Sequence, residues 1–327
     1  MENKYSKKYI IETGMGLQDV DHLKNSSYFT DEAKRYIKGE ISLEELEKII
    51  DSYYKNKPNE EERTEEADKI SVRIAQLIED DSFVFSVGQL MSIHKRLFEG
   101  VYGHAGKFRD YNFSKKEWIL DGASVFYADY RLLKNTLQYD FDLEKEFEYM
   151  GLSMNEIINH LAGFISNIWQ VHPFEEGNTR TTAVFVIKYL RSIGFTATND
   201  TFAKNAWYFR NALVRANYRN VRKNVYEDKS FIIRFLRNLL LGESNDLHNR
   251  YLHISFASQI VLPYKESTVL ELIKINPSIR LSEIADALNV SPRTVDNLVA
   301  SLVRKGLIER VGGKKNGHWE IKQKQAQ

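Results

Sequence analysis

The sequence lacks cysteine altogether and has only five prolines in 327 residues. Without cysteine, disulfide bonds, thiol catalysis and cysteine-bound zinc are excluded. No apolar run approaches the ~18 residues that a membrane-spanning helix needs, so the sequence predicts no membrane segment. The first sixteen residues also lack the apolar centre of a signal peptide, and we therefore expect a cytoplasmic protein.

The sequence also lacks a marked excess of positive or negative charge. Lys and Arg number 46 and Asp and Glu 45, which gives a formal net charge of +1. This balance excludes a chain that is basic throughout, so any DNA contact must come from a local patch. Apolar residues make up 43% of the chain, enough for a substantial core. Few prolines and long stretches of helical apolar spacing predict a mainly α fold.

Changes in composition along the chain predict four segments. Residues 1–64 form an N-terminal helical appendage, 65–245 a core dense in apolar and aromatic residues, 246–262 a linker and 263–327 a C-terminal domain. Within the appendage, Gly39 is expected to separate two helices. Ser42 and Glu45 have the spacing of a capping box at the start of the second helix.

One part of the core departs from helical spacing. Asp121-Gly122 is a strong turn signal between runs rich in aromatic and β-branched residues, at about 109–130. This pattern predicts a β-hairpin inside a helical domain. Two segments that are apolar on nearly all sides follow, as expected of central helices, and Gly194 is predicted to close the second one.

Polar side chains concentrate in WQVHPFEEGNTR, residues 169–180, between those two central helices. Pro173 stops the incoming helix, and Gly177 permits a backbone conformation that other residues resist. Gly177 to Arg180 then lie at the N-terminus of the next helix. Free N–H groups and the helix dipole make such a terminus a binding site for anions, phosphate above all.

Three side chains of this segment can supply chemistry. Arg180 offers a guanidinium that matches phosphate oxygens, and Glu176 is placed to hold Mg²⁺ together with substrate phosphates. His172 titrates near neutrality and suits a general base. Each residue alone has an ordinary structural explanation. Together, within nine residues, they indicate phosphoryl or nucleotidyl transfer to a deprotonated nucleophile.

The segment HPFEEGNTR resembles the signature of the Fic family, H-P-F-x-D/E-G-N-G-R-x-x-R. The matching positions are His172, Pro173, Phe174, Glu176, Gly177, Asn178 and Arg180. The segment IHKRLFEGVYGHAGKFRDYNF (93–113) is similar to the family segment that leads into its flap, so the resemblance covers about 65–245. It implies a Fic helical core with a β-hairpin flap. It also implies transfer of AMP from ATP to a Ser, Thr or Tyr hydroxyl of a target protein, self-modification included.

The resemblance further implies individual roles. His172 would deprotonate the target hydroxyl, and Glu176 would hold Mg²⁺ against the α- and β-phosphates of ATP. Nucleotide-binding residues are expected to be Gly177, Asn178, Thr179, Arg180, Tyr208 and Asn211, the last two at the base end. The flap residues expected to dock the target segment by strand addition are Asn112, Phe113, Ser114, Lys115 and Lys116.

Two positions depart from the family pattern. Thr179 stands where the family usually has glycine, and Ala183 where it has a second arginine. The family's inhibitory motif, S/T-x-x-x-E-G/N, does not occur in the sequence, although residues 35–46 resemble the stretch that follows it in antitoxin-type partners. We therefore expect an enzyme without the usual glutamate inhibition, active as isolated or regulated in another way.

The C-terminal segment LSEIADALNVSPRTVDNLVASLVRKGLIERV (281–311) resembles a bacterial winged helix-turn-helix. Ser291 and Pro292 have the types expected at the start of its recognition helix. The residues expected to contact DNA are Ser291, Arg293, Thr294 and Asn297 on this helix and Lys314 and Lys315 on the wing. The alternative is a docking or dimerisation module, which would fit a homodimer.

Two other functions stay open from the sequence. The chain can be a DNA-binding transcriptional regulator whose Fic core senses a nucleotide. It can also be a Fic enzyme that transfers another phosphate-containing group. The intact His172 favours an enzyme, because nucleotide sensing alone requires no general base.

Overall fold

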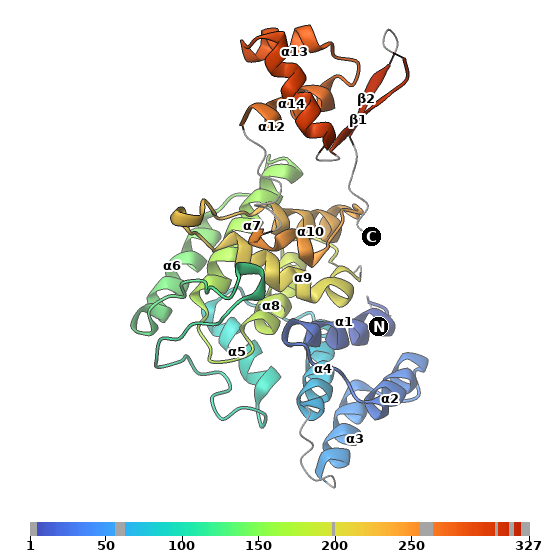
Figure 1. Cartoon of the computed structure of the whole chain (residues 1–327). Helices are drawn as coiled ribbons and strands as arrows, with labels where there is room; N and C mark the ends of the chain where they lie inside the picture. Colours follow the sequence, from blue (N-terminus) through green and yellow to red (C-terminus); the bar gives the residue numbers. More distant parts are fainter. Residues whose placement is uncertain are drawn as a thin grey trace. The chain divides into compact units, whose positions relative to one another are not determined.

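The computed structural model describes residues 5–55, 63–197, 200–255, 264–304, 307–313 and 317–321. It is mainly α, with 65% helix and a C-terminal two-stranded hairpin, which confirms the predicted fold class. The chain divides into two compact units, Met1–Phe256 and Ala257–Gln327 (Figure 1). Among the described residues, no helix combines the length and the apolar character needed to cross a bilayer.

Helices build nearly all of the first unit. In chain order its elements are α1 (Lys7–Gly16), η1 (Leu17–Asp21), α2 (Ser27–Lys38), α3 (Leu43–Lys55), α4 (Thr64–Glu79), α5 (Val87–Phe98), η2 (Trp118–Leu120), η3 (Tyr130–Leu132), α6 (Leu133–Glu146), α7 (Met154–Val171), α8 (Asn178–Ser192), α9 (Thr201–Ala216), η4 (Val221–Lys223), α10 (Ser230–Leu241) and η5 (Asn249–Leu252), where η marks a 3₁₀ helix.

The helix boundaries predicted in the appendage are confirmed. Gly39 takes a left-handed conformation, φ 80°, and ends α2. Before α3, the Ser42 N–H donates to the Glu45 carboxylate at 2.8 Å, and the Glu45 N–H donates to Ser42 Oγ at 3.2 Å. The helix α1 was not predicted. It is packed on two sides, against α4 and α9, so its sequence carries no single apolar stripe.

Two glycines let α1 approach its neighbours closely. A Cβ atom at Gly14 would lie 2.3 Å from the Ser71 carbonyl oxygen of α4, and one at Gly16 would lie 2.1 Å from the Ala203 carbonyl oxygen of α9. No real Cβ atom fits at these distances. The backbone of α1 is therefore clamped between α4 and α9, and η1, which follows directly, is fixed beside α8.

The centre of the first unit is α8. All its residues from Asn178 to Leu190 are buried, and it packs against α4, α5 and α7 (Figure 1). Gly194, with φ 95°, follows its C-terminal turn as predicted. A helix that is enclosed on all sides has no polar stripe in its sequence, which agrees with the nearly all-round apolar segment that predicted a central helix here.

The β-hairpin predicted at about 109–130 is not formed. The chain does turn at Asp121 and Gly122, with φ 53° and 80°. The two arms, however, form no strand, and between them the Glu117 N–H donates to the Ala123 carbonyl at 2.9 Å. Two of the aromatic side chains that suggested strands, Phe113 and Tyr127, pack on His172, whereas Trp118 and Phe126 are exposed. We call residues 112–129 the flap.

Arg109 secures both ends of the flap. Its guanidinium donates to the carbonyl oxygens of Tyr111 at 2.7 Å, Ala128 at 2.5 Å and His172 at 2.8 Å. Its backbone N–H donates to the Pro173 carbonyl at 2.9 Å. One buried side chain thus replaces the ladder in holding the arms together.

The second unit contains α12 (Tyr264–Ile275), α13 (Leu281–Leu288), α14 (Pro292–Arg304), β1 (Ile308–Val311) and β2 (His318–Ile321). Pro292 begins α14, and the Thr294 N–H donates to Ser291 Oγ at 3.3 Å, as predicted. The strands β1 and β2 pair antiparallel and form the expected wing. The wing residues Lys314 and Lys315 lie outside the described residues.

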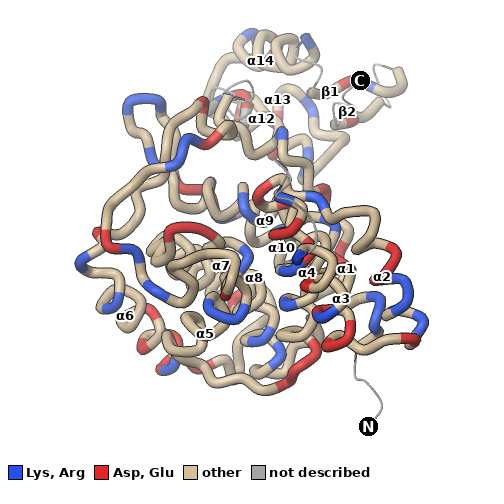
Figure 2. The backbone as a smooth tube through the Cα atoms, turned by 90° about the horizontal axis from the view of Figure 1, so that it is seen from below, with Lys and Arg blue, Asp and Glu red and all other residues tan. Residues whose placement is uncertain are grey.

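Basic and acidic residues are interspersed on the first unit (Figure 2). On α2, for example, Lys34 pairs with Asp31 and Arg35 with Glu32. This mixture matches the near-zero net charge of the chain.

The close approach of α1 yields a stability prediction. Gly14→Ala should lower the free energy of unfolding by about 1–3 kcal/mol, because α1 must move away from the Ser71 carbonyl. Thermal or urea unfolding measures the change. The matched control is Gly163→Ala inside α7, where the nearest atom, Lys229 Nζ, lies 3.6 Å from the new Cβ. This control should be neutral or stabilising. Equal stabilities for the two variants would contradict the packing of α1.

Candidate active site

His172 ends α7 in the left-handed conformation, with φ 49°. Its backbone N–H donates to the Trp169 carbonyl at 3.1 Å, and its Nδ1 lies 3.3 Å from the same oxygen. A carbonyl only accepts, so a proton on Nδ1 satisfies this contact. The neutral imidazole then carries its lone pair on Nε2.

The flap covers the His172 ring. Tyr127 stacks on it with centroids 4.0 Å apart, and Phe113 meets it edge-on at 5.8 Å. Only 3% of His172 is exposed. Burial, assisted by the positive charge of Lys115, lowers the pKa of His172 well below the ordinary value for histidine. The imidazole is therefore neutral at pH 7 and fit to accept a proton.

Gly177 is the N-cap of α8. Its φ is 75°, and a Cβ atom there would lie 2.3 Å from the Phe98 ring, so glycine is required on both grounds. The next residue, Asn178, uses its side chain within the loop. It accepts from the Phe174 N–H at 3.0 Å and donates to the Phe174 carbonyl at 2.7 Å. Toward a ligand, Asn178 therefore offers its backbone N–H.

Thr179 is anchored in a similar way, because its Oγ1 accepts from Trp169 Nε1 at 3.0 Å. The residue that stands where the family has glycine is thus tied to the end of α7. This contact couples the turn at the start of α8 to the segment that carries His172.

His94 of α5 supports the same loop and was not singled out in the sequence. Its Nδ1 accepts from the Gly106 N–H at 2.8 Å, so its Nε2 donates to the Glu176 carbonyl at 3.0 Å. Its ring stacks on Phe174 at 3.7 Å. Burial lowers the pKa of His94 to about 4, which keeps this donor and acceptor pair intact at neutral pH.

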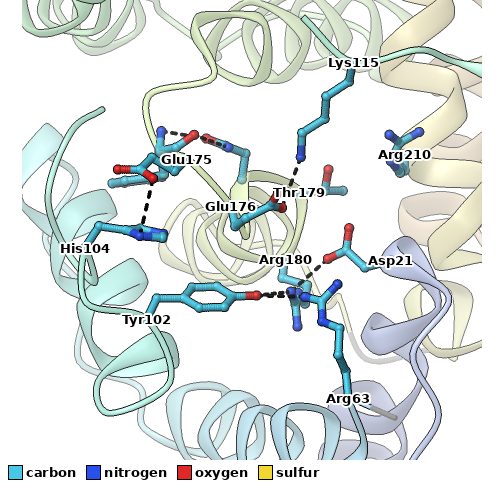
Figure 3. Close-up of polar contacts among 12 residues, drawn as sticks. Asp21, Arg63, Tyr102, His104, Lys115, Glu175, Glu176, Thr179, Arg180 and Arg210 are labelled. Atoms are coloured by element: carbon cyan, nitrogen blue, oxygen red, sulfur yellow. Dashed lines mark hydrogen bonds and ion pairs between the residues drawn. The ribbon is translucent and has the colours of Figure 1, made fainter. Parts of the chain in front are cut away.

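Arg180 is fully buried at the start of α8. Its guanidinium lies 2.8 Å from a carboxylate oxygen of Asp21 (Figure 3). It also lies 2.8 Å from a carboxylate oxygen of Glu66 and donates to Gln18 at 3.1 Å. Burial favours the neutral form of Arg180, but the two carboxylates outweigh it and raise its pKa above the ordinary value. The arginine is permanently charged.

The carboxylates of Glu66 and Asp21 differ in how many other side chains bind them. Glu66 of α4 also accepts from Arg63 at 2.7 and 2.8 Å and from the Tyr102 hydroxyl at 2.5 Å. Asp21, at the end of η1, has Arg180 as its nearest cation. Burial would raise the pKa of Asp21, but Arg180 and Lys115 lower it below its ordinary value. Asp21 is therefore the counter-ion that an incoming anion would have to displace.

Glu176 is the most exposed polar group of the motif, with 44% of its side chain accessible. Lys115 of the flap lies 3.1 Å from its carboxylate. No cluster of three or more metal-ligating side chains occurs among the described residues. One accessible carboxylate fits Mg²⁺, which commonly binds through one carboxylate and substrate phosphates. Lys115 would have to leave Glu176 first.

The other predicted residues fall into two groups. Of the five predicted flap residues, Phe113 contacts His172 and Lys115 contacts Glu176. Asn112 instead accepts from the Tyr130 N–H at 2.9 Å, and Ser114 and Lys116 are exposed. Tyr208 and Asn211 are buried and bond elsewhere. Tyr208 donates to Phe231 of α10 at 3.4 Å, and Asn211 donates to Asn249 of η5 at 2.7 Å.

Arg210 of α9 was not predicted, yet its positive charge acts on both Asp21 and His172, and Figure 3 draws it with the residues of the site. It donates to both oxygens of Glu117, at 2.7 and 3.0 Å. Asp21, Glu66, His94 and Arg210 come from elements far from the motif in the chain. Nothing in one sequence marks such long-range partners.

Comparison with family sequence models gives two matches. The Fic/DOC family matches residues 84–190, and the MarR family matches residues 262–317. The first range contains the whole motif and the flap. The second contains α12, α13, α14 and β1, and it ends just before β2.

Two curated proteins are similar to parts of the chain. "Protein adenylyltransferase VbhT" of Bartonella schoenbuchensis is 30% identical over 111 residues, which cover 34% of this chain and 22% of that protein. "Probable protein adenylyltransferase Fic" of Escherichia coli is 25% identical over 133 residues, or 41% of this chain and 64% of that protein. The chain thus spans about a fifth of the first relative and less than two thirds of the second.

Two crystal structures also resemble the chain. A Fic family protein from Desulfovibrio desulfuricans aligns over 98% of this chain and 89% of its own, with 12% identity and a TM-score of 0.43. The N-terminal Fic domain of a Bartonella effector protein aligns over 60% and 79%, with 18% identity and a TM-score of 0.38. At these TM-scores neither structure carries a conclusion about this chain.

The ion pair between Asp21 and Arg180 yields the prediction for this site. Asp21→Asn should raise the affinity for pyrophosphate about tenfold, because the anion no longer competes with a carboxylate for the guanidinium. Isothermal titration calorimetry measures the affinity. Asp19→Asn is the matched control, since Asp19 is an exposed aspartate on the same 3₁₀ helix. An unchanged affinity in Asp21→Asn would mean that Arg180 is not the anion-binding group.

Proposed function

We propose, from the premise that the chain is a Fic/DOC family protein with a C-terminal MarR-type winged-helix domain, that it transfers AMP from ATP to a hydroxyl side chain of a target protein. The observation that carries the proposal lies in one loop. His172 has a pKa lowered by burial and a free Nε2, and the N-terminus of α8 with Arg180 follows within the same motif.

The proposed reaction is a single displacement. His172 Nε2 accepts the proton of the target hydroxyl while the hydroxyl oxygen attacks the α-phosphorus of ATP. The bond between the α-phosphorus and its bridging oxygen breaks, and pyrophosphate leaves with that oxygen. Arg180 and the backbone N–H groups of Asn178 and Thr179 stabilise the negative charge that builds up on the phosphates. Mg²⁺, when bound, would neutralise part of the same charge beside Glu176.

Two features of the resting structure must change before this reaction. Asp21 must yield Arg180 to the phosphates, and the flap must uncover the His172 ring. Asp21 belongs to the N-terminal appendage, so the appendage supplies a negative charge to the site without the family's inhibitory motif. This arrangement supports regulation by another route, as expected from Ala183 and the missing glutamate motif.

Intact-mass spectrometry tests the proposal. After incubation with ATP and Mg²⁺, the protein or an added protein mixture should gain the mass of one AMP per modified hydroxyl. His172→Ala should reduce the rate at least 10²-fold, the range typical for loss of a general base. His248→Ala removes a histidine that meets the Tyr251 ring edge-on outside the site, and this control should retain activity.

Three outcomes separate the candidate chemistries. A gain of one phosphate, or of another group, would replace AMP transfer by the alternative transferase. Modification that persists in His172→Ala would exclude His172 as the base. No modification in either the wild type or Asp21→Asn, although ATP binds, would favour a nucleotide sensor.

A second function is favoured by the MarR match and by the surface of α14. Val295, Val299 and Leu302 face the core of the second unit, while Arg293 and Asn297 are exposed. These are side-chain types that bind guanine and adenine edges in the major groove. We propose that this unit binds duplex DNA through α14.

Selection from a random-sequence duplex library, followed by gel-shift titration, tests DNA binding. Arg293→Ala should weaken binding to the selected sequence by about 1–3 kcal/mol and relax the preference at one base pair. Lys274→Ala removes the same charge from an exposed position on α12 and should have a smaller effect. Binding that is absent at low salt would leave the docking or dimerisation module as the function of the unit.

A further inference from the structure

Three cations converge on the N-terminus of α8, and each is paired with one carboxylate of the resting protein. Arg180 pairs with Asp21, Lys115 with Glu176 and Arg210 with Glu117, in addition to the bond of Arg180 to Glu66. Figure 3 shows Arg180, Lys115 and Arg210 around Thr179. The first two belong to the motif or contact it directly. Arg210 lies outside the motif, on α9, and its carboxylate partner Glu117 belongs to the flap.

The side chain of Arg210 is close to the site and partly accessible. It projects from α9, and 13% of its surface is exposed. Its charge helps to lower the pKa of Asp21, the partner of Arg180, and the pKa of His172. A guanidinium whose charge acts on both Asp21 and His172 is close enough to the site to meet a polyphosphate chain.

The helix α8 cannot supply a second cation to this place. Position 183 is a buried alanine. Farther along α8, Lys188 donates to the backbone carbonyls of Leu77 and Asp80, and Arg191 donates to the carbonyl of Ile78. Arg180, Lys115 and a helix N-terminus would then face an entire triphosphate, which carries more charge than they neutralise.

We propose that Arg210 binds the terminal phosphates of the nucleotide, and that Glu117 is its counter-ion only while the site is empty. This inference rests on the proposed function and adds a binding residue from a separate helix. The two parallel bonds that Arg210 makes to the Glu117 carboxylate are the same bonds that a guanidinium makes to two phosphate oxygens. Phosphate replaces carboxylate without any change in the geometry around the guanidinium.

The competing explanation is that the Arg210–Glu117 pair only supports the flap. Two variants separate the explanations, because both break the same ion pair but act oppositely on a bound phosphate. Arg210→Gln removes the proposed ligand. Glu117→Gln keeps the shape of the partner and releases Arg210 from a negative charge.

Calorimetric titration of the full chain with a non-hydrolysable ATP analogue and with AMP, both with Mg²⁺, is the experiment. Arg210→Gln should lower the affinity for the ATP analogue about tenfold and leave that for AMP unchanged, because AMP lacks the terminal phosphates. Glu117→Gln should raise the affinity for the ATP analogue several-fold. Lys204→Gln, which removes the same charge from an exposed position on α9, is the control and should bind like the wild type.

Equal losses of affinity in Arg210→Gln and Glu117→Gln would overturn the inference in favour of a structural pair. Wild-type affinity in Arg210→Gln would overturn it as well, and the proposed AMP transfer would stand. If the wild type and Asp21→Asn bind neither nucleotide, the proposed function fails together with the inference. Thermal unfolding of each variant shows whether a loss of affinity accompanies a loss of fold.

Discussion

The buried positive charge of Arg180 is the constraint on which the rest of the first unit depends. A guanidinium with no exposed surface must be surrounded by compensating groups. The protein supplies them from three different places in the chain, because Gln18 and Asp21 come from η1, Glu66 from α4 and the Phe98 ring from α5. The N-terminal appendage is therefore part of the electrostatic structure of the core.

The same principle extends over the whole site. Each cation that is suited to an anionic ligand already has a carboxylate partner, so the resting site is close to neutral although it is rich in charge. A ligand that binds there does not meet an unshielded cluster of cations. It must exchange places with carboxylates, which makes affinity depend on how firmly each carboxylate is held. Among them, Asp21 lies on a short 3₁₀ helix and Glu117 lies on the flap, the elements with the least regular backbone support.

The sequence predicted what is encoded over short distances. His172, Gly177 and Arg180 lie within nine residues, and both the capping box at Ser42 and the start of α14 are local patterns that the structure confirms. Contacts between residues far apart in the sequence, such as those that bring Asp21 and Arg210 to the site, could not be predicted.

The errors also have physical causes. Aromatic residues at 109–130 suggested strands, but Phe113 and Tyr127 pack on the His172 ring and neither arm forms a strand. Asn178 stays a predicted nucleotide-binding residue, but its side chain bonds the backbone of Phe174, which leaves its backbone N–H for a ligand.

Arg109 has one further consequence, which concerns how the flap can move. Because a single guanidinium is bonded to the carbonyls of Tyr111 and Ala128, the two feet of the flap stay together whatever its tip does. These bonds favour movement of the flap as one piece, with its two arms held together at the base. Arg109 therefore closes the base of the flap next to the His172 backbone.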